Sequence, residues 1–209
     1  MRAILRRLYL SPLGVVASIL QNFVAVFHRP FMVYGYYNRV TRKNNKFTRI
    51  SSSATIIDRS KLDMGDNTWV WHHSIIDASN SVKIGNGCQI GAWVGIFTHS
   101  STMAIRLLGE RYICIDKDER LGYKRGPVEI GEYTFVGASS LILPGVKIGK
   151  GCIIGAGCIL SKSVPDYSIV AGNPGEVVGE TTRMDSKYFD EKVVQENYYD
   201  KEVLRRYRG

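Results

Sequence analysis

The fold is decided by residues 130–160, which read IGEYTF VGASSL ILPGVK IGKGCI IGAGCI L when they are written in groups of six. The first residue of each group is aliphatic and the fifth is small. A period of six matches neither the 3.6-residue turn of a helix nor the two-residue alternation of a lone strand. It predicts short strands separated by tight corners. The aliphatic lead residues are Ile130, Val136, Ile142, Ile148, Ile154 and Leu160.

The same pattern occupies the residues before this stretch. Its lead residues there are Ile50, Ile56, Met64, Val70, Ile76, Ile84, Ile90 and Ile96. In these fourteen hexads, the residue four positions after the lead is small in all but one, where Asn80 stands. Three hexads close a triangular coil, and successive coils stack at the strand spacing of about 4.8 Å. We expect lead and small residues to face inward, and the glycines that follow many leads to adopt positive φ at the corners.

The composition fits one globular domain built on this repeat. The 209 residues are 44% hydrophobic and 22% charged, which is enough for one core and excludes a disordered chain. The four cysteines are unevenly spaced and form no CxxC motif, which argues against a disulfide scaffold or a zinc finger. Cys88, Cys152 and Cys158 fall at the small inward position, so we predict reduced core thiols and a cytoplasmic protein.

The net charge of +9 is concentrated in the first quarter of the chain. Residues 1–49 hold nine Lys and Arg and no acid, which leaves 19 of the 28 bases against 19 acids elsewhere. This distribution argues against a nucleic-acid partner. Residues 8–27 are uncharged and largely apolar. We predict that residues 1–49 form a basic, apolar helical segment at a membrane surface; packing on the protein and a single membrane span are the alternatives.

The pattern [LIV]-G-x-x-[STAVC]-x resembles the hexapeptide-repeat acyltransferases over residues 50–180. This resemblance implies a left-handed parallel β-helix, whereas the general rule for crossover connections favours a right-handed one. It also implies acetyl-CoA as acyl donor, no metal, and a homotrimer that binds the donor between neighbouring prisms. Residues 181–209 have the pattern of short amphipathic helices, expected to pack on the prism or on a neighbour.

One long insertion interrupts the repeat between Ile96 and Ile130, which are 34 residues apart instead of six. An inserted loop of this length, residues 98–128, is usually functional. His99 stands at its root, and the resemblance implies that a histidine at this point of the pattern is the general base. An imidazole with its ordinary pKa of about 6.5 is largely neutral at cytoplasmic pH and can accept a proton. We expect direct attack of an acceptor hydroxyl on the thioester, without a covalent enzyme intermediate.

The resemblance also assigns the donor site, in the hexads after the insertion. Gly137 and Ala138 match the stretch that lies along the pantetheine arm, with Gly155 and Ala156 about one coil above them. Ser161 and Lys162 match a Thr-Lys pair near the nucleotide, and Pro174 belongs to the exit turn. Two residues depart from the family pattern. Phe135 stands where Trp is common, and Glu176 lies where a base usually follows the Asn-Pro turn.

The acceptor candidates are Trp71 and His73, which the hexad alignment places near a substrate-binding Asn of sugar-acetylating relatives. Exterior packing at a subunit contact is the alternative for both. Asp77 is a carboxylate that could orient a histidine, but it is not among the predicted site residues.

These observations predict an acetyl-CoA-dependent O-acetyltransferase. The acceptor would be a sugar hydroxyl of a bacterial surface polysaccharide or of its lipid-linked precursor, at the inner face of the cell membrane. The alternatives are an N-acetyltransferase acting on an amino sugar or nucleotide sugar, and a non-enzymatic β-helix scaffold. A zinc-dependent carbonic anhydrase of the same fold is disfavoured, because adjacent His72 and His73 point to opposite faces of a strand.

Overall fold

The structure is a computed structural model that describes residues 11–208 and divides the chain into two units, Met1–Phe31 and Met32–Gly209. The first unit contains helix α2, Pro12–Phe27, which begins with Ser11 Oγ accepting a hydrogen bond from the Gly14 amide at 3.3 Å. Residues 8–10 of the predicted uncharged stretch lie outside the described residues. Among the residues that are described, no helix has the length and apolar character needed to cross a membrane.

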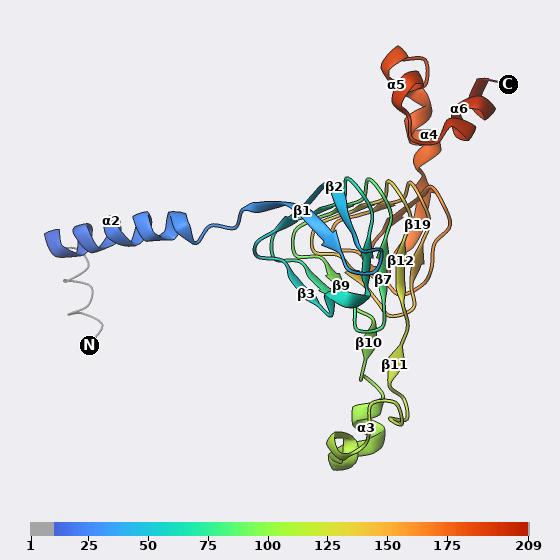
Figure 1. Ribbon diagram of the computed structural model, residues 1–209. Helices are drawn as coiled ribbons and strands as arrows, with labels where there is room; N and C mark the ends of the chain where they lie inside the picture. Colours follow the sequence, from blue (N-terminus) through green and yellow to red (C-terminus); the bar gives the residue numbers. More distant parts are fainter. Residues whose placement is uncertain (1–10, 209) are drawn as a thin grey trace. The chain divides into compact units, whose positions relative to one another are not determined.

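The second unit is built on three sheets, A, B and C, which the chain visits in turn (Figure 1). Sheet A contains β1 Met32–Asn38, β2 Lys43–Ser51, β5 Trp69–Val70, β8 Gln89–Ile90, β13 Phe135–Val136, β16 Ile153–Ile154, β18 Ser168–Ala171 and β19 Glu176–Glu180. Sheet B contains β3 Thr55–Ile57, β6 Ile75–Asp77, β9 Gly95–Ile96, β14 Leu141–Ile142 and β17 Ile159–Leu160. Sheet C contains β4 Leu62–Met64, β7 Val82–Ile84, β12 Val128–Ile130 and β15 Lys147–Ile148. Consecutive strands therefore pass from A to B to C, and each coil pairs in parallel with the next.

The predicted lead residues form the core of this three-sided coil. Thirteen of the fourteen are buried, and Ile56 packs against them partly buried. Their register is that of stacked coils, since Ile130 pairs with Ile84 on one side and with Ile148 on the other. The three inward cysteines are buried free thiols, and burial raises the pKa of Cys88 to about 12.

Several of the small residues in the hexads carry a hydroxyl that also forms a hydrogen bond. Buried hydroxyls at this position donate to a backbone carbonyl of the next coil: Thr68 to Gly85 at 3.1 Å, Thr134 to Gly149 at 2.9 Å and Ser140 to Gly155 at 2.8 Å. A buried hydroxyl without a partner would cost stability. These bonds therefore join successive coils along the narrow axis.

The glycines that follow the leads do not adopt positive φ, so that expectation is wrong. The Cβ of a side chain at Gly85, Gly131 or Gly137 would lie 2.4–2.6 Å from a backbone nitrogen of the next coil. Positive φ occurs two residues later, for example at Tyr133 (55°) and Ser139 (61°). Close approach of stacked backbones, not left-handed φ, is therefore what requires glycine after the lead residue.

Other elements cover both ends of the coil. Residues 32–51 form the antiparallel pair β1–β2, so within the described part of the predicted segment 1–49, α2 is helical and residues 32–49 belong to a hairpin. The reason is the open edge of the first coil, where Asn38 Nδ2 donates to the Met64 carbonyl at 3.0 Å. At the other end β18 and β19 are antiparallel.

Short helices follow β19: α4 Thr181–Asp185, the 3₁₀ turn Ser186–Tyr188, α5 Lys192–Asn197 and α6 Lys201–Arg208. Asp200 ties them to the coil, because its Oδ2 lies 2.6 Å from Lys150 Nζ and also accepts from the Tyr167 hydroxyl. Burial alone would raise the pKa of Asp200, but hydrogen bonds from Lys150 and Tyr167 outweigh it and lower this pKa to about 2.

The inserted loop leaves the coil between sheets B and C and projects from it (Figure 1). It contains β10 His99–Ser100, α3 Ala104–Leu108, the 3₁₀ helix Gly109–Cys114 and β11 Lys124–Arg125. β10 and β11 pair antiparallel, with His99 opposite Arg125, and form the stem of the loop. A further 3₁₀ turn, Arg59–Lys61, lies outside this loop, between β3 and β4.

Candidate active site

Two corners of the coil carry the predicted site residues. We call residues 71–74, 91–94, 137–140 and 155–158 the AB corner, because they connect strands of sheet A to strands of sheet B. The BC corner consists of residues 58–61, 78–81, 97–98, 143–146 and 161–163, which follow strands of sheet B. The stem of the inserted loop leaves from the BC corner.

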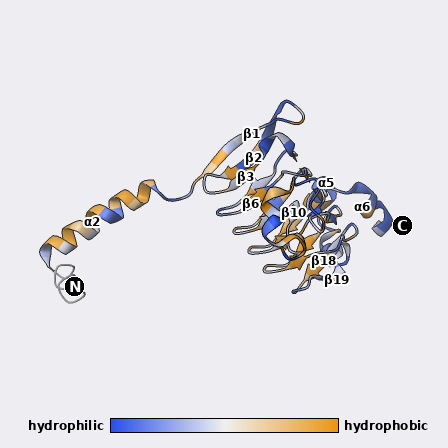
Figure 2. Ribbon diagram, turned by 90° about the horizontal axis from the view of Figure 1, so that it is seen from below, coloured by the Kyte–Doolittle hydropathy of each residue, from blue (hydrophilic) through white to orange (hydrophobic). Residues whose placement is uncertain are grey.

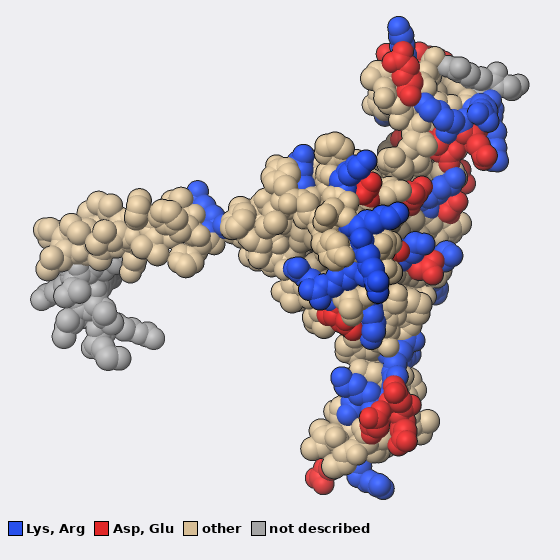
Figure 3. All heavy atoms as spheres, in the orientation of Figure 1, with Lys and Arg blue, Asp and Glu red and all other residues tan. Residues whose placement is uncertain are grey.

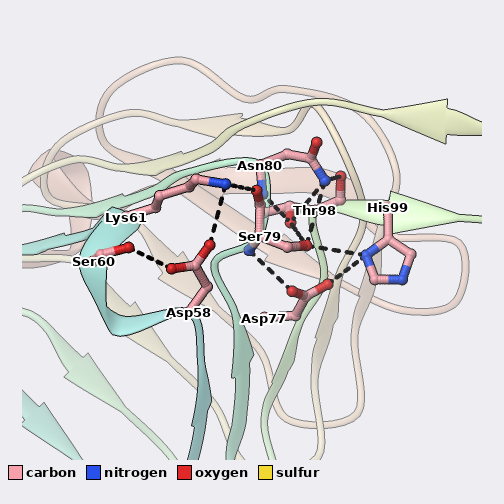
Figure 4. A network of polar contacts seen from close by, with 8 residues as sticks. All are labelled: Asp58, Ser60, Lys61, Asp77, Ser79, Asn80, Thr98 and His99. Atoms are coloured by element: carbon pink, nitrogen blue, oxygen red, sulfur yellow. Dashed lines mark hydrogen bonds and ion pairs between the residues drawn. The ribbon is translucent and has the colours of Figure 1, made fainter. Parts of the chain in front are cut away.

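His99 stands where the BC corner meets the inserted loop, and a carboxylate of the preceding coil lies against it. The Oδ2 atom of Asp77 is 2.6 Å from His99 Nδ1, and Ser79 Oγ is 3.3 Å from the same nitrogen (Figure 4). The side chain of Asp77 is 2% exposed, whereas that of His99 is 40% exposed. The coil thus holds the imidazole by one edge, and the side chain remains partly open to solvent.

Asp77 is held as an anion. Its burial acts to raise the pKa of the carboxyl, but hydrogen bonds from Ser79 and the charge of His99 outweigh burial and hold this pKa below its ordinary value. The Ser79 amide donates to Asp77 Oδ1 at 3.0 Å. A carboxylate beside Nδ1 favours the imidazole tautomer with its proton on that nitrogen. Nε2 then carries the free lone pair, which is the arrangement that a general base requires.

The coils around this pair are joined by further polar contacts. The backbone N–H of Asn80 donates to Thr98 Oγ1 at 3.0 Å, and the side-chain Nδ2 of Asn80 donates to the Thr98 carbonyl at 3.2 Å (Figure 4). Thr98 is buried and directly precedes His99. The backbone that carries His99 is therefore fixed to the coil below it.

Sequence reasoning predicted His99 but did not assign its partners. A signal for them was present: Ser79 occupies the same hexad position as His99 one coil earlier, three residues after the lead. Asp77 directly follows the lead Ile76, at the position where many other hexads have glycine. A charged residue that replaces the repeat's glycine beside the insertion marks the carboxylate.

The predicted donor residues occupy both corners in the coils after the insertion. Gly137, Ala138, Gly155 and Ala156 lie on the AB corner, where the Gly157 amide donates to the Ala138 carbonyl at 2.8 Å. Ala138 is half-buried and Ala156 is exposed. This part of the AB corner therefore presents backbone with little side chain over it.

Ser161 and Lys162 lie on the BC corner, two coils beyond His99, and both are exposed. Lys162 Nζ is 3.7 Å from Glu176 Oε1. Glu176, the departure from the family pattern, therefore faces the lysine that would meet phosphate charge. Pro174 is exposed in the turn between β18 and β19, at the same end of the coil.

The acceptor candidates lie on the AB corner and not beside His99 in the same chain. Trp71 is 40% exposed, and the ring of His73 stacks on Trp93 with centroids 5.8 Å apart. Their corner is the one that carries Ala138 and Ala156 farther along the coil. In one chain the structure thus brings the acceptor and pantetheine candidates to one corner and the base to the next.

Metal ligation was not predicted. Within residues 11–208 the structure contains no group of three His, Cys, Asp or Glu side chains placed to hold a metal ion.

Comparison with known proteins identifies the repeat. Residues 127–162 match the family described as bacterial transferase hexapeptide (six repeats). Residues 127–162 therefore carry the bacterial transferase hexapeptide. The resemblance drawn from the sequence, to the hexapeptide-repeat acyltransferases, is confirmed by this match and by the relatives that follow.

A protein of Saccharomyces cerevisiae named "Putative acetyltransferase" is 33% identical over 129 residues, which are 61% of this hexapeptide-repeat chain and 60% of the yeast protein. The chain therefore spans three fifths of that relative's length. A galactoside acetyltransferase, solved in complex with coenzyme A, has 26% identity and a TM-score of 0.53, covering 63% of this chain and 61% of its own.

A maltose O-acetyltransferase from Clostridium difficile 630 has 23% identity and a TM-score of 0.50, covering 62% of this chain and 64% of its own, and shares the fold. Solved chains named as acetyltransferases thus share the architecture described above.

Proposed function

We propose that this chain is an acetyl-CoA-dependent O-acetyltransferase that acts on a sugar hydroxyl, with His99 as general base. The observation that carries the proposal is the His99–Asp77 pair, 2.6 Å apart, at the root of the only long insertion in a hexapeptide repeat. The relatives support it, because they are named as acetyltransferases and one was solved with coenzyme A. The homotrimer, the left-handed winding and the cytoplasmic site of action belong to the same proposal.

The reaction needs one base and no covalent intermediate on the protein. The acceptor hydroxyl attacks the thioester carbonyl while His99 Nε2 removes its proton, and Asp77 stabilises the imidazolium that forms. The new C–O ester bond forms and the C–S bond breaks. The imidazolium then returns the proton to the thiolate of coenzyme A. Base catalysis of this kind contributes roughly 10²–10⁴ in rate, and a backbone N–H of the cleft would stabilise the oxyanion.

Each predicted residue has a role in this scheme. The backbone at Gly137, Ala138, Gly155 and Ala156 lies along the pantetheine arm, and Lys162 with Ser161 and Pro174 meets the nucleotide end. Donor phosphates would compete with Glu176 for Lys162. Trp71 and His73 form an aromatic wall for the sugar ring.

The proposal also includes the organisation of the chain. Residues 50–180 are the catalytic β-helix, and 181–209 are a helical tail. Residues 1–49 make a peripheral membrane contact, so that a lipid-linked acceptor at the inner face of the membrane is within reach. Its support is the absence of acids before Asp58 and the exposed apolar surface of α2.

The test begins with donor binding and then measures turnover. Thermal unfolding is followed while acetyl-CoA or coenzyme A is added; at 100 times its Kd a ligand stabilises the folded protein by about 2.7 kcal/mol. Free thiol release is then measured with a panel of sugars, amino sugars and lipid-linked sugars. We expect stabilisation by the donor, turnover with a hydroxyl acceptor, and loss of turnover in His99→Ala but not in His28→Ala. No stabilisation at millimolar donor would favour the scaffold alternative, and turnover with amino sugars alone would favour N-acetylation.

A further inference from the structure

The inserted loop ends in a stack of planar side chains, and His99 is the last member of that stack. The Arg120 guanidinium lies 4.1 Å from the ring centroid of Tyr112 and 5.9 Å from that of Tyr123. The ring of Tyr123 in turn stacks on the imidazole of His99, with centroids 5.7 Å apart and planes inclined by 23°. The loop therefore does more than leave the coil at His99, because it returns to cover the face of that ring.

The remaining contacts of this stack hold Tyr123 in place. The Arg125 guanidinium lies 5.2 Å from its centroid, and Arg125 is itself bound to Asp118. Arg125 also sits opposite His99 in the β10–β11 pair, so the backbone fixes the separation of the two strands. Cations over an aromatic face are attractive, and they are worth more where water is partly excluded.

The contacts to the coil hold His99 at one edge only. Asp77 and Ser79 both meet Nδ1, which fixes that atom but leaves rotation of the ring plane about the contact. The side chain is 40% exposed, so surrounding core atoms do not restrict that rotation. A planar neighbour at stacking distance supplies the missing restraint, since tilting the imidazole would break the ring contact.

We propose that Tyr123 is a positioning residue for His99: its ring fixes the plane of the imidazole so that Nε2 points at the acceptor site. This role gives the inserted loop a function in the reaction, as the second support of the base. It rests on the proposed function for its kinetic consequence, but not for its structural one. The stacking interaction is a property of the ring, so the Tyr123 hydroxyl is not required.

The experiment distinguishes the effect of the Tyr123 ring from that of its hydroxyl, and it measures the position of His99 independently of enzyme activity. Tyr123→Phe keeps the ring, Tyr123→Leu removes it, and Leu121→Ala changes an exposed residue of the same loop as a control. The ring protons of His99 are observed by NMR and assigned from their absence in His99→Gln. We expect the ring-current shift of His99 to persist in Tyr123→Phe and Leu121→Ala, and to vanish in Tyr123→Leu.

Kinetics then test the consequence. A base displaced from its productive geometry costs roughly tenfold to a hundredfold in rate. We expect kcat to fall by that factor in Tyr123→Leu, with an unchanged KM for acetyl-CoA, and to stay within about twofold of the parent in Tyr123→Phe. An unchanged His99 spectrum in Tyr123→Leu would overturn the proposal, as would equal loss of kcat in the Phe and Leu variants. If no acceptor supports turnover, the proposed function fails while the NMR comparison still decides the role of Tyr123.

Discussion

Asp77 is part of a strand of the repeat and also contacts His99 of the candidate site. It directly follows the buried lead Ile76, and both of its carboxylate oxygens have assigned contacts, Oδ1 to the Ser79 amide and Oδ2 to His99. Its negative charge stabilises the imidazolium more than the neutral imidazole. In the proposed reaction the carboxylate would therefore assist the proton transfer when charge develops on His99, which is where an electrostatic contact accelerates a reaction.

Replacing this charge with an amide should affect turnover and leave binding intact. In Asp77→Asn we expect kcat to fall between about tenfold and a thousandfold, with donor KM unchanged, because the amide accepts a hydrogen bond but does not offset the positive charge. The matched control is Asp58→Asn. Asp58 lies in the preceding coil of the same polar network, bonded to Ser60 and Lys61 and not to His99 (Figure 4). Equal kinetic losses in the two variants would contradict the assigned role.

Sequence reasoning singled out His99 as the candidate base because a histidine beside a long insertion is conspicuous in a regular repeat. The role of Asp77 depends on how residues of adjacent coils align, and the coil from Ile76 to Ile96 has 20 residues instead of eighteen. Ile76 and Ile96 pair in register, so the contact of Asp77 with His99 depends on the path of the two corners that follow them, which the spacing of the hexads does not specify. The contact between Tyr123 and His99 could not be predicted from the sequence, because the spacing of an irregular loop does not indicate which of its residues packs against the stem.

At the scale of elements, the repeat's glycines can be tested for close approach. The Cβ of an alanine at Gly131 would lie 2.4 Å from the Lys150 backbone nitrogen, so the stacked coils must separate locally. We expect Gly131→Ala to lower the free energy of unfolding by about 1–3 kcal/mol, measured by denaturant unfolding. Gly179→Ala is the control, because the nearest atom to its Cβ is 3.6 Å away. A neutral Gly131→Ala would mean that the coils tolerate a wider spacing.

Helix α2 has the surface of an interfacial helix. Small and polar residues form one stripe along it, which begins at the N-cap Ser11 and continues through Gly14, Ser18, Gln21, Asn22 and Ala25. Large apolar side chains cover the rest, and Leu13, Ile19, Phe23 and Phe27 are each more than 60% exposed. The helix carries no charged residue (Figure 3) and is mostly hydrophobic along its length (Figure 2). Buried apolar area and nearby bases are the two contributions to binding an anionic lipid surface.

Vesicle flotation tests this contact with two variants of equal charge. Ile19→Glu with Phe23→Glu places two acids on the apolar face, and Ser18→Glu with Asn22→Glu places two acids on the polar stripe. We expect the full chain to float with vesicles that contain anionic lipid, the apolar-face variant to be lost from them, and the stripe variant to be retained at least in part. Equal loss in both variants would show that charge alone, and not insertion of the apolar face, holds the protein at the lipid.

The elements outside the repeat were harder to predict than those within it. The period located the lead residues between Ile50 and Leu160, thirteen of which are buried, because inward packing in a triangular coil requires an apolar side chain at that position. The hairpin β1–β2 has no such period, and its partner is the exposed edge of the first coil. From the sequence alone, residues 32–49 were therefore predicted as part of the basic, apolar segment. Their pairing as a hairpin depends on the edge strand of the coil, which the sequence pattern does not indicate.

At the scale of the whole molecule, the proposed site residues are divided between two corners of one chain. The proposed base lies at the BC corner and the pantetheine candidates lie on the AB corner, with sheet B between them. Sheet B carries the outward aliphatic side chains Ile75, Leu141 and Ile159, and none of these three is fully buried. A donor lying across this face would be open to water on its outer side. A second copy packed against sheet B would cover that side, as the proposed homotrimer requires.

Complementation decides whether two copies share the site. His99→Ala removes the base, and Ala156→Trp fills the open stretch of the AB corner, so each variant alone should be inactive. If the base of one copy serves the donor held by its neighbour, co-expression of the two variants with different tags gives some interfaces in which both intact halves meet. Random assembly of equal amounts makes this about a quarter of all interfaces in a cyclic trimer, so about a quarter of the parent activity should return. Doubly tagged oligomers without activity would place base and donor in the same chain, because every chain in the mixture then carries a defect.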